Sequence, residues 1–189
     1  LGANRVFFQV RGNATVCYPS AIEPWAWELT GNSPETIGVD PGWDPLAAAL
    51  AEAEKNGLEL HAWLNVFPGW RGVVPAPPGT KQPWATHRSW FMIDHQGVLL
   101  RPTQSFYSFL SPGIPAVRSY LAKVFGEVVK RYPKLDGIHL DYVRYPGRTE
   151  VGNFRDFSYD RESVDAYKKM YKKAPQYNHP EWQRFKCEQ

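Results

Sequence analysis

The sequence predicts an α/β protein that forms part of a (β/α)8 barrel, and three observations lead to this fold class. Strand-like and helix-like segments alternate along the chain, long loops follow the strands, and the links from helix to strand are short. This order produces parallel strands with right-handed helical crossovers. Long loops after the strands favour a barrel, because a barrel builds its site from them. A doubly wound sheet is the alternative, but no glycine-rich phosphate-binding turn follows any strand.

The first strand is predicted at residues 5–11, where the side chains alternate in character. One face carries Val6, Phe8 and Val10, and the other carries Phe7, Gln9 and Arg11. Residues 12–43 form a long loop, and loops of this length in a compact domain are usually functional or disordered. Asp44 and Pro45 then begin a helix as its N-cap and first residue, and Gly57 ends it.

The second strand is predicted at residues 58–65, and a third, buried strand at residues 136–142. In the second strand, the face that we expect to point inward carries Glu59, His61, Trp63 and Asn65. Between these strands lies a long excursion, in which two short apolar runs predict a β-hairpin at residues 89–100. Further helices are expected at residues 116–132, at 163–173 and from 180 onward.

The composition is that of an ordinary globular protein, with 43% hydrophobic and 22% charged residues. A net charge of +3 without a basic stripe argues against a nucleic-acid partner. No apolar run reaches the ~18 residues of a membrane span, and no signal peptide is visible. The cysteines Cys17 and Cys187 are expected to be free, buried thiols.

Polar side chains gather at the C-terminal ends of the three predicted strands. Alternation places six of them inward: Gln9 and Arg11, His61 and Asn65, and His139 and Asp141. Such groups cost free energy when they are buried without partners, and barrels keep their chemistry at this end of the strands. Satisfied polar groups in a core would explain one such strand, but three in register favour a functional cleft.

The chain resembles the glycosyl hydrolase-like 10 family in five segments, which occur in the order FFQVRG, YPSAIEPWAWELTG, DPLAAALAEAEKNGLELHAWLN, LSPGIPAVRSYL and DGIHLDYVRYP. The resemblance implies an exported bacterial envelope protein with a (β/α)8 barrel related to glycoside hydrolases. Only three strands are clear in 189 residues, whereas a complete barrel needs about 250. We therefore expect residues 1–189 to be a single partial barrel domain, truncated at both ends, with about strands 2 to 4, their helices and their long loops.

The resemblance further implies that Asp141 is a catalytic carboxylate, because related glycosidases carry their nucleophilic aspartate at the end of the fourth barrel strand. It implies a poly- or oligosaccharide substrate, with aromatic rings that stack on the sugars. The residues expected to bind this substrate are Gln9, Arg11, Trp25, His61, Trp63, Asn65, His139, Tyr142 and Arg144. The chain departs from the family at Thr15, where many relatives have an aspartate, and Asn13 would substitute only in part.

The sequence does not reveal a second carboxylate to act as the proton donor of glycoside hydrolysis. Glu59 lies at the opposite end of its strand, and Glu23 and Asp40 lie in loops without a defined geometry. A non-catalytic glycan-binding barrel is therefore the alternative.

A metal-dependent hydrolase with His61, His139 and Asp141 as ligands is a third and less favoured hypothesis. The His-x-Asp spacing is a weak signal, and the cysteines are remote from it in the sequence. We expect neither a metal nor another cofactor.

Overall fold

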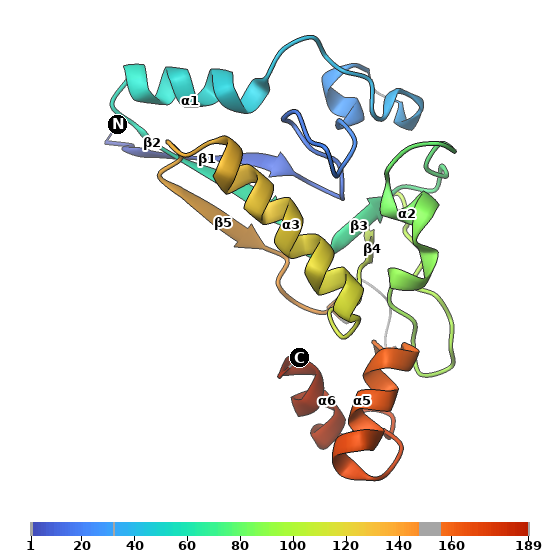
Figure 1. Cartoon of the computed structure of the whole chain (residues 1–189). Helices are drawn as coiled ribbons and strands as arrows, with labels where there is room; N and C mark the ends of the chain where they lie inside the picture. Colours follow the sequence, from blue (N-terminus) through green and yellow to red (C-terminus); the bar gives the residue numbers. More distant parts are fainter. Residues whose placement is uncertain (1, 32, 148–155, 189) are drawn as a thin grey trace.

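The main sheet of the protein consists of three parallel strands (Figure 1). The computed structural model describes residues 2–31, 33–147 and 156–188. The strands lie in the order β1 (Arg5–Arg11), β2 (Glu59–Asn65) and β5 (Gly137–Asp141). Their C-terminal ends point the same way, so the polar residues predicted at these ends meet at one edge of the sheet. The three predicted strands are confirmed to within one residue at each end.

Helices α1 (Pro45–Lys55) and α3 (Pro115–Arg131) cover one face of this sheet. Asp44 caps α1 as predicted, because its carboxylate accepts a hydrogen bond from the N–H of Ala47 at 3.0 Å. Among the described residues, no helix has both the length and the apolarity that crossing a bilayer requires. The apolar core between helices and sheet consists chiefly of Val10, Leu46, Leu50, Ala53, Leu60, Ala62, Leu64 and Val128.

Smaller helices and strands form within the long segments that follow β1, β2 and β5. Strands β3 (Pro68–Arg71) and β4 (Tyr107–Phe109) pair antiparallel in a separate two-stranded sheet. The other elements in the described part of the chain are the helices η1 (Trp27–Leu29), η2 (Pro34–Thr36), α2 (Pro83–Thr86), η3 (Arg88–Trp90), α5 (Arg161–Tyr171) and α6 (Pro180–Cys187).

The predicted hairpin at residues 89–100 forms only in part. Its turn is present, since the N–H of Gly97 donates to the carbonyl of Asp94 at 2.9 Å, but Ile93 and Leu99 pair only as an isolated bridge. The regular pairing of this region lies instead in β3 and β4, which the sequence does not predict. These strands have four and three residues, too few for an alternating pattern to be recognised.

The prediction that the third strand is buried is wrong. Ile138 and Leu140 of β5 lie on the same side of the sheet as the buried Ala62 and Leu64, yet they are 38% and 43% exposed. The reason is the position of β5 at the edge of the sheet, where neither α1 nor α3 covers its outer face. Within the described residues β5 pairs with β2 alone, so its other edge keeps unpaired backbone groups.

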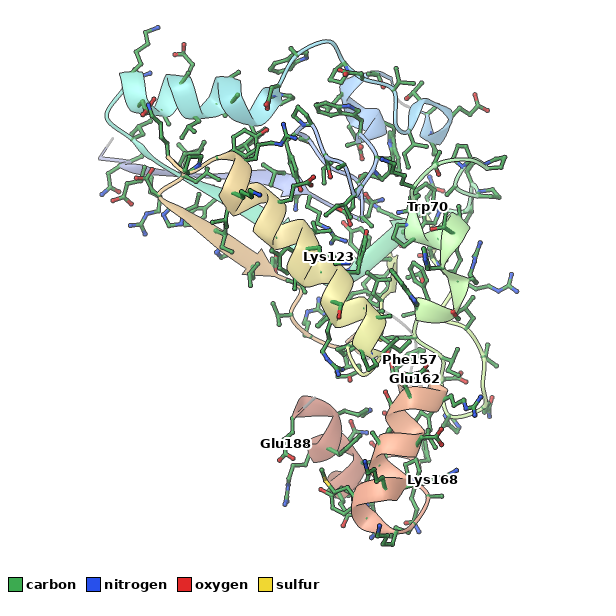
Figure 2. The ribbon with its side chains drawn as sticks, viewed as in Figure 1. Trp70, Lys123, Phe157, Glu162, Lys168 and Glu188 are labelled. Atoms are coloured by element: carbon green, nitrogen blue, oxygen red, sulfur yellow. The ribbon has the colours of Figure 1, made fainter. Side chains whose placement is uncertain are left out.

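Several tryptophans of the long loops pack inside the protein. Trp70 belongs to β3, is fully buried and lies near α2 (Figure 2). Its ring centroid is 5.4 Å from that of Trp27, and its Nε1–H donates to the carbonyl of Val74 at 3.1 Å. Trp84 is also buried and meets the ring of Phe91 edge-on at 4.7 Å. These rings form a second core that holds the loops in place.

The two cysteines are free, and their surroundings differ. Cys17 is half-buried, and burial raises the pKa of its thiol to about 11, with the Glu28 carboxylate adding to the effect. Cys187 lies at the end of α6 and is exposed, so the prediction of two buried thiols is wrong for this residue.

We expect iodoacetamide at pH 8 to label Cys187 in the folded protein much faster than Cys17, because the thiolate is the reactive form. Peptide mass spectrometry would measure the extent of labelling at each residue. In denaturant the two thiols should react alike, which provides the control. Equally fast labelling of both cysteines in the native protein would contradict the burial of Cys17.

Candidate active site

The strand register brings the predicted inward residues into rows across the sheet. Gln9 of β1 is opposite Trp63 of β2, which is opposite His139 of β5. One step further toward the C-terminal ends, Asn65 is opposite Asp141. The residues predicted on these strands therefore share one face of the sheet, which is the face that α1 and α3 leave open. Arg11 is the exception, because a register shift after Gln9 places it opposite the buried Leu64.

A glycine makes room for the aromatic part of this face. Phe7, His61 and Gly137 form the row nearest the middle of the sheet. A Cβ atom at Gly137 would lie 2.7 Å from two ring atoms of His61, so the imidazole packs directly over the glycine backbone. The ring of Phe7 then contacts those of His61 and His139, with centroids 5.3 and 5.1 Å away. Trp63 completes the group, edge-on to His139 at 5.9 Å.

Asp141 lies at the last position of β5 and is half-buried. Its Oδ1 accepts a hydrogen bond from the N–H of Tyr142 at 2.6 Å, and its carbonyl accepts one from Val66 N–H at 2.8 Å. The opposite residue, Asn65, is fixed by two bonds: it donates to the carbonyl of Gly12 at 2.9 Å and accepts from Gln9 at 3.3 Å. Contacts with the backbone and with Gln9 thus hold the carboxylate and the amide at opposite positions of neighbouring strand ends.

Tyr142 turns the chain away from the sheet directly after Asp141. Its φ of +53° lies in the left-handed region, which residues other than glycine seldom adopt. The ring packs against Tyr107 and Phe109 of β4, with centroids 5.5 and 5.9 Å away. The guanidinium of Arg144 lies 4.8 Å from the ring centroid of Tyr142. The tyrosine therefore connects the end of β5 with the separate β3–β4 sheet.

Arg11 is fully buried and directs its donors to protein acceptors. Its Nε and one terminal nitrogen bind the carboxylate of Glu23 at 2.8 and 2.7 Å, and the other terminal nitrogen binds the carbonyls of Asn65 and Val66. The hydroxyl of Tyr120 donates to the same carboxylate, and burial together with Glu23 raises the pKa of this tyrosine well above its usual value. Glu23 thus has a defined geometry, contrary to the interpretation from sequence. The predicted contact of Arg11 with substrate stays a prediction.

Three further polar residues, which sequence reasoning missed or weighed differently, support the strand ends. Thr15 donates to the side chain of Asn13 at 2.8 Å, and both are buried. Gln82 is fully buried and donates to the carbonyl of Asn13 at 2.9 Å and to that of Gly69. No sequence pattern marks Gln82, because its acceptors are backbone atoms of distant loops. These residues join the loop after β1 to β3.

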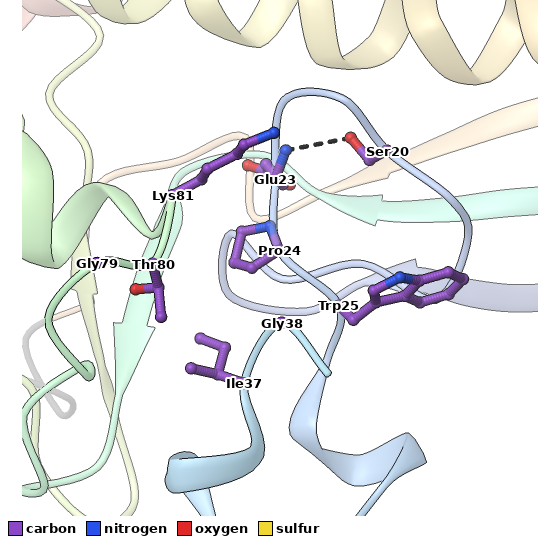
Figure 3. Close-up of a pocket in the computed structure, with 9 residues that line it drawn as sticks. All are labelled: Ser20, Glu23, Pro24, Trp25, Ile37, Gly38, Gly79, Thr80 and Lys81. Atoms are coloured by element: carbon purple, nitrogen blue, oxygen red, sulfur yellow. Dashed lines mark hydrogen bonds between the residues drawn. The ribbon is translucent and has the colours of Figure 1, made fainter. Parts of the chain in front are cut away.

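Trp25 lies apart from the sheet residues. It lines a pocket of about 300 Å³ between the loop after β1 and the loop after β3, together with Ser20, Glu23, Thr80 and Lys81 (Figure 3). None of the predicted residues on β1, β2 and β5 lines this pocket. The structure therefore brings Gln9, His61, Trp63, Asn65, His139 and Asp141 together, with Tyr142 and Arg144 following, and places Trp25 elsewhere.

Within the described residues, the open face has neither a cluster of metal ligands nor a second carboxylate at the C-terminal ends of its strands. Among the described residues, no three His, Cys, Asp or Glu side chains converge in the way that metal ligands do. On the three described strands, the carboxylates of the open face are Asp141 and Glu59, and Glu59 lies at the opposite end, paired with Arg5 at 2.5 Å. Asp141 is thus the carboxylate that these strands place at their C-terminal ends.

The chain matches the family described as glycosyl hydrolase-like 10 over residues 1–189, which confirms the resemblance seen in the sequence. It is 38% identical to the glycosyl hydrolase DigH of Escherichia coli K12, over 78% of this chain and 33% of that protein. It is 34% identical to the glycosyl hydrolase YngK of Bacillus subtilis 168, over 88% of this chain and 30% of that protein. The chain spans about a third of the length of these relatives.

Among solved structures, a hypothetical protein from Ruminiclostridium thermocellum has a similar fold, with a TM-score of 0.52. The match covers 78% of this chain and 66% of that chain at 17% sequence identity. At this identity the likeness concerns the fold alone.

We expect Gly137→Ala to lower the free energy of unfolding of the full-length protein by about 1–3 kcal/mol, because the added methyl group collides with the His61 ring. Urea denaturation would measure the loss. In a His61→Ala background the same substitution should cost much less. An equal cost in both backgrounds would show that the imidazole is not the neighbour that excludes a side chain.

We expect Arg11→Met to lower the free energy of unfolding by about 3–5 kcal/mol, because it leaves the buried Glu23 carboxylate without its cation. The double variant Arg11→Met/Glu23→Gln should recover a large part of this loss in the same denaturation experiment. Arg5→Met is the matched control, since its pair with Glu59 is 45% exposed on both sides and should contribute less than about 1 kcal/mol. Equal losses for Arg11→Met and Arg5→Met would contradict the structural role of the buried pair.

Proposed function

Because the chain belongs to the glycosyl hydrolase-like 10 family, we propose that it is part of a glycoside hydrolase that cleaves a poly- or oligosaccharide, with Asp141 as a catalytic carboxylate. The observation that carries the proposal is the position of Asp141. It ends β5 beside Asn65, on the sheet face that the helices leave open. In parallel barrels, catalytic groups occupy this end of the strands.

The proposed architecture is a (β/α)8 barrel in which this single domain supplies about strands 2 to 4. Consecutive parallel strands, joined by helices that all pack on one face, support it. The polar open face would line the inside of the barrel, and β5 would continue into the next strand through its unpaired edge. That the matched segment spans only about a third of the relatives agrees with a larger barrel of this kind.

In the proposed reaction, Asp141 attacks the anomeric carbon while a second carboxyl group protonates the leaving oxygen, and water then hydrolyses the glycosyl–enzyme bond. Gln9, His61 and His139 lie on the open face and would hold the sugar hydroxyls. Trp63 offers an aromatic surface for a sugar ring. We assign the proton donor to a residue beyond these three strands, since Glu59 is at their opposite end. We also propose that the protein is exported and acts at the bacterial envelope.

One observation favours a second candidate function, a barrel that binds glycans without cleaving them. The described strand ends present one carboxylate together with amide, imidazole and indole groups, which is sufficient for binding sugars but not for acid–base hydrolysis. The two functions share a substrate class and differ in whether Asp141 reacts.

We expect Asp141→Asn in the full-length protein to lower glycan hydrolysis more than about a thousandfold, because the amide is a poor nucleophile. Release of reducing ends from polysaccharide would measure turnover, and circular dichroism would check the fold. Glu59→Gln is the matched control: it removes a carboxylate from the same sheet face at the other end and should leave turnover nearly unchanged.

Unchanged hydrolysis by Asp141→Asn would refute the proposed nucleophile. Binding without hydrolysis by the wild-type protein would favour the non-catalytic function.

A further inference from the structure

A second pocket, distinct from that of Trp25, lies where the chain leaves β3. Its volume is about 350 Å³, and two arginines, Arg88 of η3 and Arg101, line it. Apolar side chains form much of the remaining wall, and no carboxylate is among its lining residues. These apolar residues are Val73, Val74, Pro75, Trp84 and Pro102.

The two arginines carry like charges on the wall of one pocket. Among the described residues, neither Arg88 nor Arg101 forms an ion pair with an aspartate or glutamate. The guanidinium of Arg88 lies over the ring of the buried Trp84, 3.6 Å from its centroid, which fixes its position. Desolvation and the nearby charge of Arg101 hold the pKa of Arg88 below its usual value. An anion between the two guanidinium groups would relieve this repulsion.

The lining of the pocket indicates a kind of anion that would fit it. Guanidinium groups present planar, paired donors that match the two oxygens of a carboxylate. The wall of valines, prolines and tryptophan offers an apolar surface to the body that carries the charge, as the C–H face of a sugar would require. A carboxylate on a pyranose ring satisfies both parts of this surface.

The pocket is connected to the candidate active site through the β3–β4 sheet. Tyr142, next to Asp141, packs against Tyr107 of β4, and the guanidinium of Arg71 at the end of β3 lies 5.8 Å from the ring centroid of Tyr107. Gly72 follows Arg71 and lines the pocket. The β3–β4 sheet therefore lies between the candidate active site and the pocket.

The geometry points to a binding subsite for the carboxylate of an acidic sugar unit at Arg88 and Arg101, on the same glycan chain that the candidate active site would cleave. The inference rests on the proposed function for the identity of the ligand as a glycan. It goes beyond that function by naming the charge of the substrate and the residues that recognise it.

The test compares the binding of acidic and neutral oligosaccharides to the full-length protein. Isothermal titration calorimetry would use galacturonate hexamer and a neutral glucose hexamer of the same length, in the Asp141→Asn background so that hydrolysis does not interfere. We expect Arg88→Gln and Arg101→Gln each to weaken binding of the acidic hexamer about tenfold, because each removes hydrogen bonds to a charged group. The neutral hexamer should bind more weakly than the acidic one and be unaffected by either substitution.

Arg131→Gln is the matched control, because it removes an exposed arginine at the end of α3, outside the pocket, and should leave binding unchanged. Added salt should weaken the acidic ligand alone. Wild-type affinity in both pocket variants, or equal affinity for acidic and neutral hexamers, would overturn the subsite. Arginine-dependent binding of inorganic phosphate without binding of the acidic hexamer would also overturn it, in favour of a phosphate site.

The outcomes separate this inference from the proposed function. Hydrolysis lost in Asp141→Asn, with binding unchanged in the arginine variants, refutes only the subsite. Hydrolysis retained in Asp141→Asn, with arginine-dependent binding of the acidic hexamer, refutes only the proposed nucleophile.

Discussion

The buried ion pair of Arg11 and Glu23 is the interaction on which the C-terminal end of the sheet depends. Both side chains are fully shielded from solvent, so each charge requires the other. Arg11 ends β1, and Glu23 lies in the loop that follows. Arg11 also donates to the carbonyls of Asn65, which ends β2, and of Val66, and Glu23 accepts a hydrogen bond from the hydroxyl of Tyr120 in α3. Two strand ends, a long loop and a covering helix are therefore fixed by one pair of charges.

The position of Asp141 follows from this arrangement through the backbone. Arg11 holds the carbonyls at the end of β2, while the N–H of Val66 binds the carbonyl of Asp141 in β5. The side chain of Asn65, opposite Asp141, reaches back to Gly12 beside Arg11. The residues with predicted chemistry thus rest on a layer of structural polar contacts, which satisfies the backbone groups that parallel strands leave at their ends.

Alternation of side chains is a strong signal, and it was sufficient to predict β1, β2 and β5 and the sheet face of His61, His139 and Asp141. It fails at Arg11 because the register shifts between Gln9 and Arg11, which turns the last side chain toward Glu23 in a loop 12 residues away. It also could not predict the exposure of Ile138, which depends on whether another element covers β5. Packing of loop rings such as Trp70 is set by contacts between distant segments, and local patterns carry little information about these.

Arg11 and Arg88 have physically different surroundings, and the difference supports different roles for them. A guanidinium that serves the fold, such as that of Arg11, is buried and matched to a carboxylate and to carbonyls. Arg88 is instead placed on an aromatic ring, beside another cation, at the wall of a pocket. Folding alone gains little from placing Arg88 and Arg101 on the wall of one pocket, since like charges repel. The net charge of +3 is modest because acidic residues offset most of the basic ones, but none of them lines this pocket, where an anionic ligand would be attracted.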